Sequence, residues 1–201
     1  MGQMPKFRKC YSFNIRRYFQ QDNQSSVDAL QNAIAAFSCP RNPDVEAFLK
    51  NSAIEFTRKS QSVTYLAISA ETSELLGYFS ITVKPLTIRA DKISQTFRRR
   101  LERVSQLDET AQTYTMAAYL IAQLGKNYTD GPNERISGDD LLTLAWDVVQ
   151  DLQYVAGGVV AFVEAEGHEK LLDFYRRNHF WVSDKRATES GELIQLIRMI
   201  K

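Results

Sequence analysis

The chain has 201 residues, of which 44% are hydrophobic and 24% are charged. This composition excludes a disordered or fibrous protein, and the length fits a single α/β domain over residues 1–201 with one sizeable core. The 25 basic and 24 acidic side chains leave a net charge of +1. A polyanionic partner would therefore have to bind a local patch rather than a global field.

Cysteine content and hydropathy indicate the cellular compartment. The two cysteines, Cys10 and Cys39, form no C-x-x-C pair. They argue against a disulfide scaffold and a metal site, and they favour a reducing compartment. The N-terminus lacks the apolar run of a signal peptide, and no window approaches the roughly 18 consecutive apolar residues of a membrane span. We therefore expect a cytoplasmic protein with no membrane association.

The first half of the chain alternates strand-like and helical patterns. A strand is expected at 11–19, helices at 26–37 and 43–59, and two strands at 63–69 and 75–83 that are joined by a hairpin. Asn42 and Pro43 favour a helix start, because a side-chain cap precedes a proline at the first helical position.

A basic amphipathic helix follows. Its apolar positions recur every three or four residues at Ile93, Phe97, Leu101 and Val104. Its outer face carries four arginines: Arg98, Arg99, Arg100 and Arg103. Such a run of charge is usually a solvated face, and the alternative is a patch for nucleic acid.

The second half has the order strand, helix, strand, helix, and then two strands. A nearly uncharged strand at 114–124 is typical of the middle of a sheet. The helix from about 138 has its apolar residues at helical spacing, and Gly157 and Gly158 precede a buried strand at 159–166. A short helix at 168–178 and strands at 180–183 and 193–200 complete the chain. The strand–helix–strand unit needs a right-handed parallel crossover, so we predict a mixed α/β sheet with helices on both faces.

The junction before the helix at 138 is a candidate phosphate site. A helix N-terminus presents unpaired N–H groups, and Gly138 would let the backbone approach a ligand closely. The alternative needs no ligand, because Ser137 and Asp140 have the spacing of a capping box. Asp139 and Asp140 also put negative charge where a pyrophosphate would lie.

The segment 114–181 resembles the cofactor-binding half of the GNAT acetyltransferase superfamily. Those proteins run strand, glycine-rich loop, helix, strand, then a turn of the type N-x-x-A-x-x-x-Y and a final Gly-Phe. Here His168 takes the Asn place, Tyr175 matches the tyrosine, and His179 with Phe180 replaces Gly-Phe. The order of the upstream elements also fits, so the resemblance covers nearly the whole chain.

Within that superfamily the chain is most similar to small bacterial members that include tRNA-acetylating toxins. The cue is the segment 47–77, in which a helix ending in basic residues precedes a strand and the run Leu-Leu-Gly-Tyr-Phe-Ser. This likeness implies a toxin-like protein with tRNA as a partner. A homodimer is left open, without a residue-level case for it.

The resemblance implies acetyl-CoA as co-substrate. The strand at 114–124 would splay from its neighbour and offer its backbone to the pantetheine arm. The usual loop Q/R-x-x-G-x-G/A is reduced here to Asn133-x-x-Ile136-x-Gly138, over which the pyrophosphate would lie, with Arg135 and Lys126 to offset the aspartates. The implied cofactor-binding residues are Ile121, Ala122, Gln123, Leu124, Arg135, Ile136, Ser137, Gly138, Asp139, Asp140 and His168.

The resemblance makes Tyr175 the acid that protonates the departing thiolate; the alternative is a tyrosine that packs under the sheet. For the general base, the period of two places Glu164 and Glu166 on the same face of their strand as Phe162. The alternative is a pair of exposed structural glutamates. The expected function is an N-acetyltransferase acting on a small amine, a protein amine or an aminoacyl-tRNA. The competing hypothesis is a degenerate GNAT fold that binds an acyl-CoA or a partner without catalysis.

Overall fold

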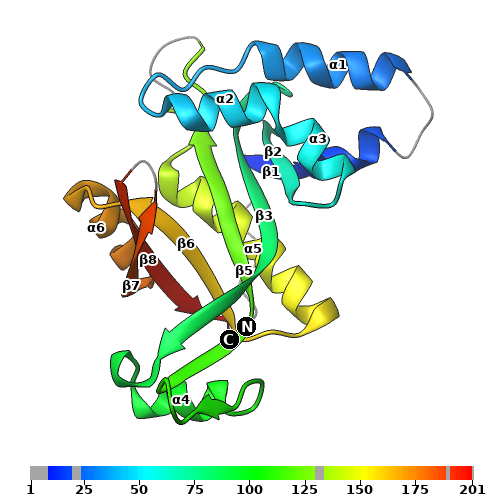
Figure 1. Ribbon diagram of the computed structural model, residues 1–201. Coiled ribbons are helices and arrows are strands. Elements are labelled where there is room, and N and C mark those ends of the chain that lie inside the picture. The colour runs from blue at the N-terminus through cyan, green and yellow to red at the C-terminus, as the bar shows by residue number, and fades with distance from the viewer. Residues whose placement is uncertain (1–8, 20–23, 130–133, 189–190, 201) are drawn as a thin grey trace, which may run out of the picture. The chain divides into compact units, whose positions relative to one another are not determined.

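The computed structural model describes residues 9–19, 24–129, 134–188 and 191–200 (Figure 1). Its strands are β1 (Cys10–Asn14), β2 (Val63–Ser69), β3 (Leu75–Arg89), β4 (Leu107–Asp108), β5 (Thr113–Lys126), β6 (Val160–Glu166), β7 (Trp181–Thr188) and β8 (Gly191–Met199). Its helices are α1 (Gln24–Ala35), α2 (Pro43–Asn51), α3 (Ala53–Arg58), α4 (Gln95–Leu101), α5 (Gly138–Ala156) and α6 (Glu169–Arg177), with 3₁₀ turns η1 (Ile15–Tyr18) and η2 (Ala90–Lys92).

The strands form a mixed sheet in the hydrogen-bonded order β1-β2-β3-β5-β6-β8-β7, and β4 pairs with β5. The pair β5–β6 is parallel, whereas β1–β2, β2–β3, β4–β5, β6–β8 and β7–β8 are antiparallel. Parallel neighbours need a crossover, and α5 supplies it between β5 and β6. The predicted mixed α/β class is therefore confirmed.

The tertiary contacts group the chain into two compact units. The first contains residues 1–81 and 123–146, and the second contains 82–122 and 147–201. Three long elements, β3, β5 and α5, contribute residues to both units. The single domain over 1–201 stays a prediction.

The first unit has its own apolar core between α1, α2 and the strands β2 and β3. The buried cluster contains Ile15, Leu30, Ile34, Phe37, Cys39, Val45, Leu49, Ala53, Leu66 and Tyr78. The Tyr78 hydroxyl donates to the Val45 carbonyl at 2.5 Å inside this core. This bond satisfies a phenol that would otherwise be buried at a cost.

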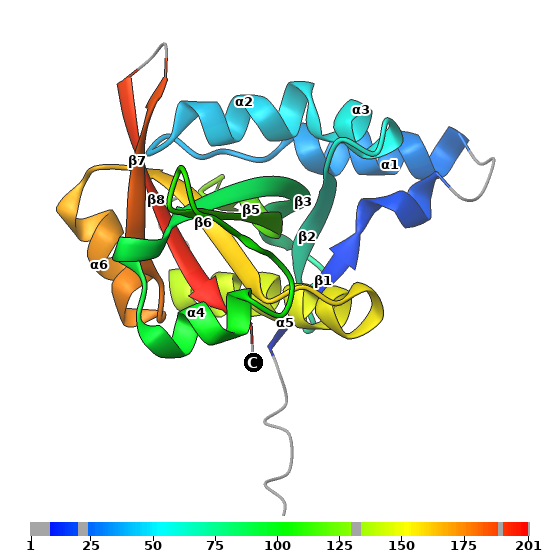
Figure 2. The same ribbon diagram turned by 60° about the horizontal axis from the view of Figure 1, so that its bottom comes forward.

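The second unit packs α4 and the later strands around another core. Its buried cluster contains Leu86, Ile88, Ala90, Phe97, Leu101, Tyr114, Met116, Ala118, Val160, Phe162 and Ile197. The β7–β8 hairpin lies next to β6, against which α6 also packs (Figure 2). The Tyr119 hydroxyl donates to the Gly157 carbonyl at 2.7 Å, where the chain turns from α5 into β6.

Several predicted bounds were wrong for local reasons. The strand expected at 11–19 ends at Asn14, whose side chain accepts from the Arg16 N–H at 2.9 Å and starts η1. The helix expected at 43–59 is divided at Ser52. The strand expected to stop at 83 continues through Pro85 to Arg89.

The predicted cap of α2 is confirmed. Asn42 caps α2 by accepting from the Val45 N–H at 3.2 Å. Neither Cys10 nor Cys39 is in a disulfide bond. Within the described ranges, no helix is long and apolar enough to cross a membrane. The same residues contain no cluster of side chains that could hold a metal ion.

Candidate functional site

The ladder between the two parallel strands is short. β5 and β6 pair only at Tyr119 with Ala161 and at Leu120 with Phe162. By contrast, every residue of β6 pairs with β8. Backbone groups beyond Leu120 and Phe162 therefore do not join β5 to β6. Within the second unit this concerns Ile121 and Ala122 of β5, whose backbone groups on that side could hydrogen-bond an extended ligand as an added strand would.

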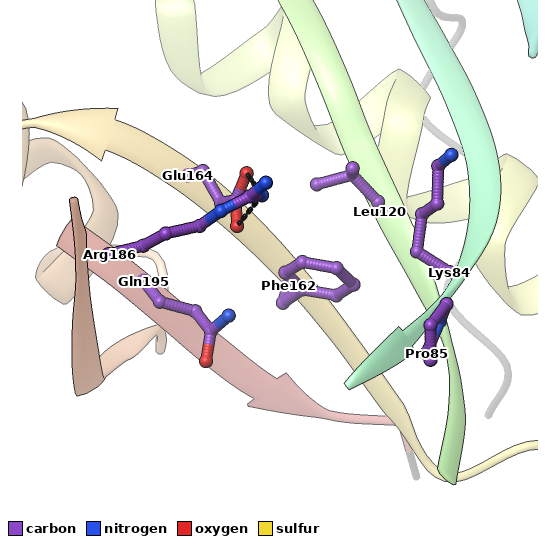
Figure 3. A pocket seen from close by; sticks show the side chains of 7 residues that line it. All are labelled: Lys84, Pro85, Leu120, Phe162, Glu164, Arg186 and Gln195. Carbon is purple, nitrogen blue, oxygen red and sulfur yellow. Dashed lines mark hydrogen bonds and ion pairs between the residues drawn. The ribbon is translucent and has the colours of Figure 1, made fainter. Parts of the chain in front are cut away.

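A pocket of about 390 Å³ lies where this ladder ends, entirely within the second unit (Figure 3). Its volume is within the range of small-molecule sites. It is lined by Lys84, Pro85, Leu120, Phe162, Glu164, Arg186 and Gln195. The last residues of the ladder, Leu120 and Phe162, thus form part of its wall.

Glu164 is the carboxylate of the pocket. Its two oxygens each lie 3.1 Å from Nη1 of Arg186, and its side chain is 16% exposed. Figure 3 shows the arginine reaching from β7 to the glutamate on β6. The charge-assisted contact orients the carboxylate without closing it off from the pocket.

Glu166 has a different environment from Glu164, although both project from the same face of β6. Its side chain is 64% exposed and lies 2.9 Å from Nε2 of His168. His168 is the N-cap residue of α6 but makes no side-chain capping bond. Neither residue lines the pocket. Their predicted roles in catalysis and cofactor binding stay predictions.

Tyr175 lies on the buried face of α6. Its ring contacts those of Phe174 and Phe180 at centroid distances of 5.0 and 5.7 Å. Burial raises the pKa of its phenol to about 12. Among the described residues nothing hydrogen-bonds its hydroxyl, and Tyr175 does not line the pocket. The phenol of Tyr175 is therefore protonated at neutral pH, and its ring packs against Phe174 and Phe180.

The turn after α6 contains His179 and Phe180, which occupy the positions of Gly-Phe in the GNAT pattern, and its geometry explains the preference for glycine there. The Phe180 N–H donates to the Tyr175 carbonyl and the His179 N–H to the Arg176 carbonyl, both at 3.0 Å. This is a Schellman cap, in which the intervening residue must be left-handed. His179 accordingly has φ of 66°. Glycine has no steric penalty in this conformation, whereas histidine does.

The N-terminus of α5, in the first unit, carries the predicted capping box. Asp140 accepts from the Ser137 N–H at 2.9 Å, and the Ser137 hydroxyl accepts from the Asp140 N–H at 3.0 Å. Asp139 is also in the first turn. Two backbone donors expected to bind pyrophosphate are therefore already satisfied within the chain.

The neighbours of this junction differ from the expected cradle. Arg135 forms an ion pair with Glu74, so its charge is already balanced. Ile136 is buried. Asn133, the first residue of the reduced loop, lies outside the described residues.

The predicted pantetheine contacts differ in exposure along β5. Ile121 is buried, Ala122 is exposed, and Gln123 and Leu124 are half-buried. The exposure of side chains does not test the backbone contacts that were predicted, and these stay predictions.

Sequence reasoning missed three polar residues of the pocket. Lys84 follows the predicted end of its strand, and Arg186 and Gln195 belong to the last hairpin. The period of two in β6 did place Phe162 and Glu164 on a common face. A prediction that continued this strand through Pro85 would have placed Lys84 in the sheet.

Neither a protein-family model nor a curated protein matches the chain. Several solved structures do match it. A bacterial toxin matches with a TM-score of 0.63 and 18% identity over 95% of this chain and 90% of that one. A tyrosine-to-phenylalanine mutant of KacT matches with a TM-score of 0.60 and 18% identity over 94% of each chain. AtaT complexed with acetyl-methionyl-tRNAfMet matches with a TM-score of 0.57 and 16% identity, over 80% of this chain and 85% of that one.

These neighbours have the GNAT fold. The likeness extends over most of each chain, so it concerns the whole architecture rather than one motif. The chain therefore has the GNAT fold, as the sequence predicted, and resembles the toxin-type structures that share it. At these identities the likeness establishes fold and not chemistry.

Proposed function

We propose that the chain is an N-acetyltransferase that transfers the acetyl group of acetyl-CoA to an amine. The observation that carries this proposal is the early end of the β5–β6 ladder beside a pocket that contains Glu164. An amide-bearing arm pairs with free strand edges, and a carboxylate in the adjoining pocket can take a proton from an ammonium group. A mutant of AtaT, one of the structural neighbours, is bound to acetyl-CoA and to the C-terminus of the antitoxin AtaR in one solved structure, which supports the choice of co-substrate.

Glu164 is the proposed general base. The acceptor nitrogen attacks the thioester carbonyl, the C–N bond forms, the C–S bond breaks, and the proton of the acceptor passes to the carboxylate directly or through water. An α-amine has a pKa near 8, so a weak base suffices for such an acceptor. Arg186 orients the carboxylate through their charge-assisted contact.

Tyr175 is the proposed donor to the departing thiolate. Its pKa of about 12 lies well above that of a thiol, which is about 8.5. Complete proton transfer from the phenol is therefore unfavourable. The role that fits its burial is a hydrogen bond that stabilises the thiolate while it leaves.

Further residues are proposed to contact the coenzyme. In the first unit these are Gln123, Leu124 and residues 135–140. In the second unit they are Ile121, Ala122 and His168. The capping box and the ion pair of Arg135 limit which of their groups remain available. Side-chain contacts are consequently more important here than loop N–H donors.

Aminoacyl-tRNA is the finer proposal for the acceptor. A neighbouring structure contains AtaT with acetyl-methionyl-tRNA, which is the product of acetylating an aminoacyl α-amine. On α4, Arg99 is exposed and Arg98 instead donates to the Ala90 carbonyl at 3.1 Å. Arg99→Gln should weaken tRNA binding and reduce its salt dependence. Unchanged tRNA binding in Arg99→Gln combined with Arg103→Gln would remove this patch from the proposal.

The test of the main proposal is the release of the coenzyme A thiol in the presence of a panel of small amines, peptides and aminoacyl-tRNA. Glu164→Gln should lower the rate by about 10²–10⁴-fold, the usual contribution of a general base. Glu166→Gln is the matched comparison, because it changes the same residue type on the same face of the same strand. A loss confined to Glu166→Gln would reverse the assignment, and no thiol release by the unaltered protein with any acceptor would end it.

A second function has one observation in its favour. The acidic first turn of α5, with its donors engaged in a capping box, favours a GNAT fold that binds an acyl-CoA or a partner without turnover. Calorimetry with acetyl-CoA, run beside the thiol-release assay, separates the two. Binding without turnover, unaffected by Tyr175→Phe, would support the non-catalytic function.

A further inference from the structure

Two cations of the first unit lie against one aromatic ring. The guanidinium carbon of Arg41 is 5.2 Å from the centroid of the Tyr128 ring, and Nζ of Lys126 is 5.7 Å from it. Neither cation forms an ion pair with a residue that the structure describes. The ring face offsets part of the cost of holding each charge there, but it does not neutralise either of them.

Hydrogen bonds between distant segments fix this arrangement. The Asn127 side chain accepts from the Ser38 N–H at 3.0 Å, and the Tyr128 N–H donates to the Ser38 carbonyl at 2.7 Å. Asn42, next to Arg41, is held by its N–H bond to Cys39 and by its capping role in α2. Both backbone segments that carry the cations are thus positioned before any ligand binds.

Burial and a neighbouring cation both disfavour the charged form of Lys126. Burial lowers the pKa of Lys126, and the nearby charge of Arg41 lowers it further, while Asp140 and Glu134 oppose these effects. Asp140 is itself engaged by Ser137 in the capping box. An anion placed against both cations would relieve their mutual repulsion.

A Cβ placed on Gly77 would lie 2.7 Å from the Gly125 carbonyl oxygen and 3.3 Å from Cδ2 of Leu141, so the residue before Lys126 lies beside the first turn of α5, in the same unit. This is the region whose loop lacks the first glycine of the GNAT pattern and whose Ser137 and Asp140 N–H groups are already bonded. The Ser137 and Asp140 N–H groups are therefore not available to a phosphate there, and side-chain cations would add charge-assisted donors.

We infer that Arg41 and Lys126 form a preorganised site for the phosphate groups of the coenzyme, supplying side-chain donors where the Ser137 and Asp140 N–H groups are already bonded. The inference rests on the proposed use of acetyl-CoA. Arg41 is outside the sequence motif and belongs to the segment between α1 and α2. The ligand class is a nucleotide pyrophosphate, recognised by two side-chain cations.

The test is calorimetric titration of the full chain with acetyl-CoA and with acetyl-pantetheine, which lacks the phosphates. Arg41→Gln and Lys126→Gln should each weaken acetyl-CoA binding by about tenfold, the loss of one charge-assisted contact. Their affinity for acetyl-pantetheine should not change. Arg17→Gln is the control, because Arg17 is also an exposed arginine over a ring in this unit, 5.8 Å from Phe13. Arg41→Lys, which keeps the charge, should retain part of the affinity.

The outcomes are separable. Acetyl-CoA binding by the unaltered protein that both glutamine variants retain would overturn this inference and leave the proposed function in place. Equal losses for acetyl-pantetheine would overturn it as well, because the effect would not concern phosphate. Loss of tRNA binding alone would assign the cations to RNA instead. An unaltered protein that binds no acetyl-CoA would overturn both this inference and the proposed function.

Discussion

Replacing Gly125 by alanine should destabilise the first unit, because the added Cβ has no room. It would lie 2.4 Å from Cγ1 of Val45 and 3.3 Å from Cε1 of Tyr78. Ordinary carbon contacts are about 3.5–4.0 Å, so Val45 would have to move by more than about 1 Å. The bond from the Tyr78 hydroxyl to the Val45 carbonyl, 2.5 Å long, resists that movement.

The magnitude follows from these contacts. Overpacking costs about 1–3 kcal/mol, and weakening a buried hydrogen bond adds about 1 kcal/mol. Restricting the unfolded chain returns about 0.4–1 kcal/mol when glycine becomes alanine. We therefore expect Gly125→Ala to lower the free energy of unfolding by about 2 kcal/mol.

The assay is a double-mutant cycle with Val45→Ala, measured by urea unfolding with circular dichroism. Val45→Ala alone should cost about 2 kcal/mol, because it removes two buried methyl groups. The double variant should be less destabilised than the sum of the two, since the shortened side chain no longer meets the new Cβ. Gly167→Ala is the control: its Cβ would meet only Cγ1 of Ile194, at 3.8 Å.

Additive costs within about 0.5 kcal/mol would refute this reasoning, because two groups that collide must be coupled. A Gly125→Ala variant as stable as the unaltered chain would refute it directly. The same contact holds α2 against the end of β5, so the cycle also tests how firmly the segment before α2 is positioned.

Three further predictions concern stability. His179→Gly should raise the free energy of unfolding by about 0.5–1 kcal/mol, measured by urea titration, because glycine adopts φ of 66° without strain. Ser137→Ala should lower it by about 1 kcal/mol in the same assay through loss of the α5 cap. Hydrogen bonds from Lys50 and from the Cys39 N–H hold the pKa of Glu46 below its usual value of 4.5. That contribution is complete above the usual pKa and is lost as pH falls through the lower folded pKa. Melting of Glu46→Gln should therefore depend less on pH over that acidic range, and an unchanged dependence would contradict the assignment.

The order of neighbouring residues is enough to predict several local structures of this protein. The strand predicted at 63–69 has the observed bounds of β2, and Asn42 caps α2 as expected. The Ser137–Asp140 box also forms as predicted. These features depend on groups within a few residues of one another, so the local order of side chains is enough to specify them.

Only the tertiary structure decided which distant groups meet. Glu164 and Glu166 are equivalent by strand period, yet Glu164 alone lines the pocket and receives Arg186. Arg41 and Lys126 contact the same ring although they lie 85 positions apart in the sequence. Such partners depend on strand order, register and where a ladder stops. These are cooperative properties of the packed chain that periodicity and local spacing do not encode.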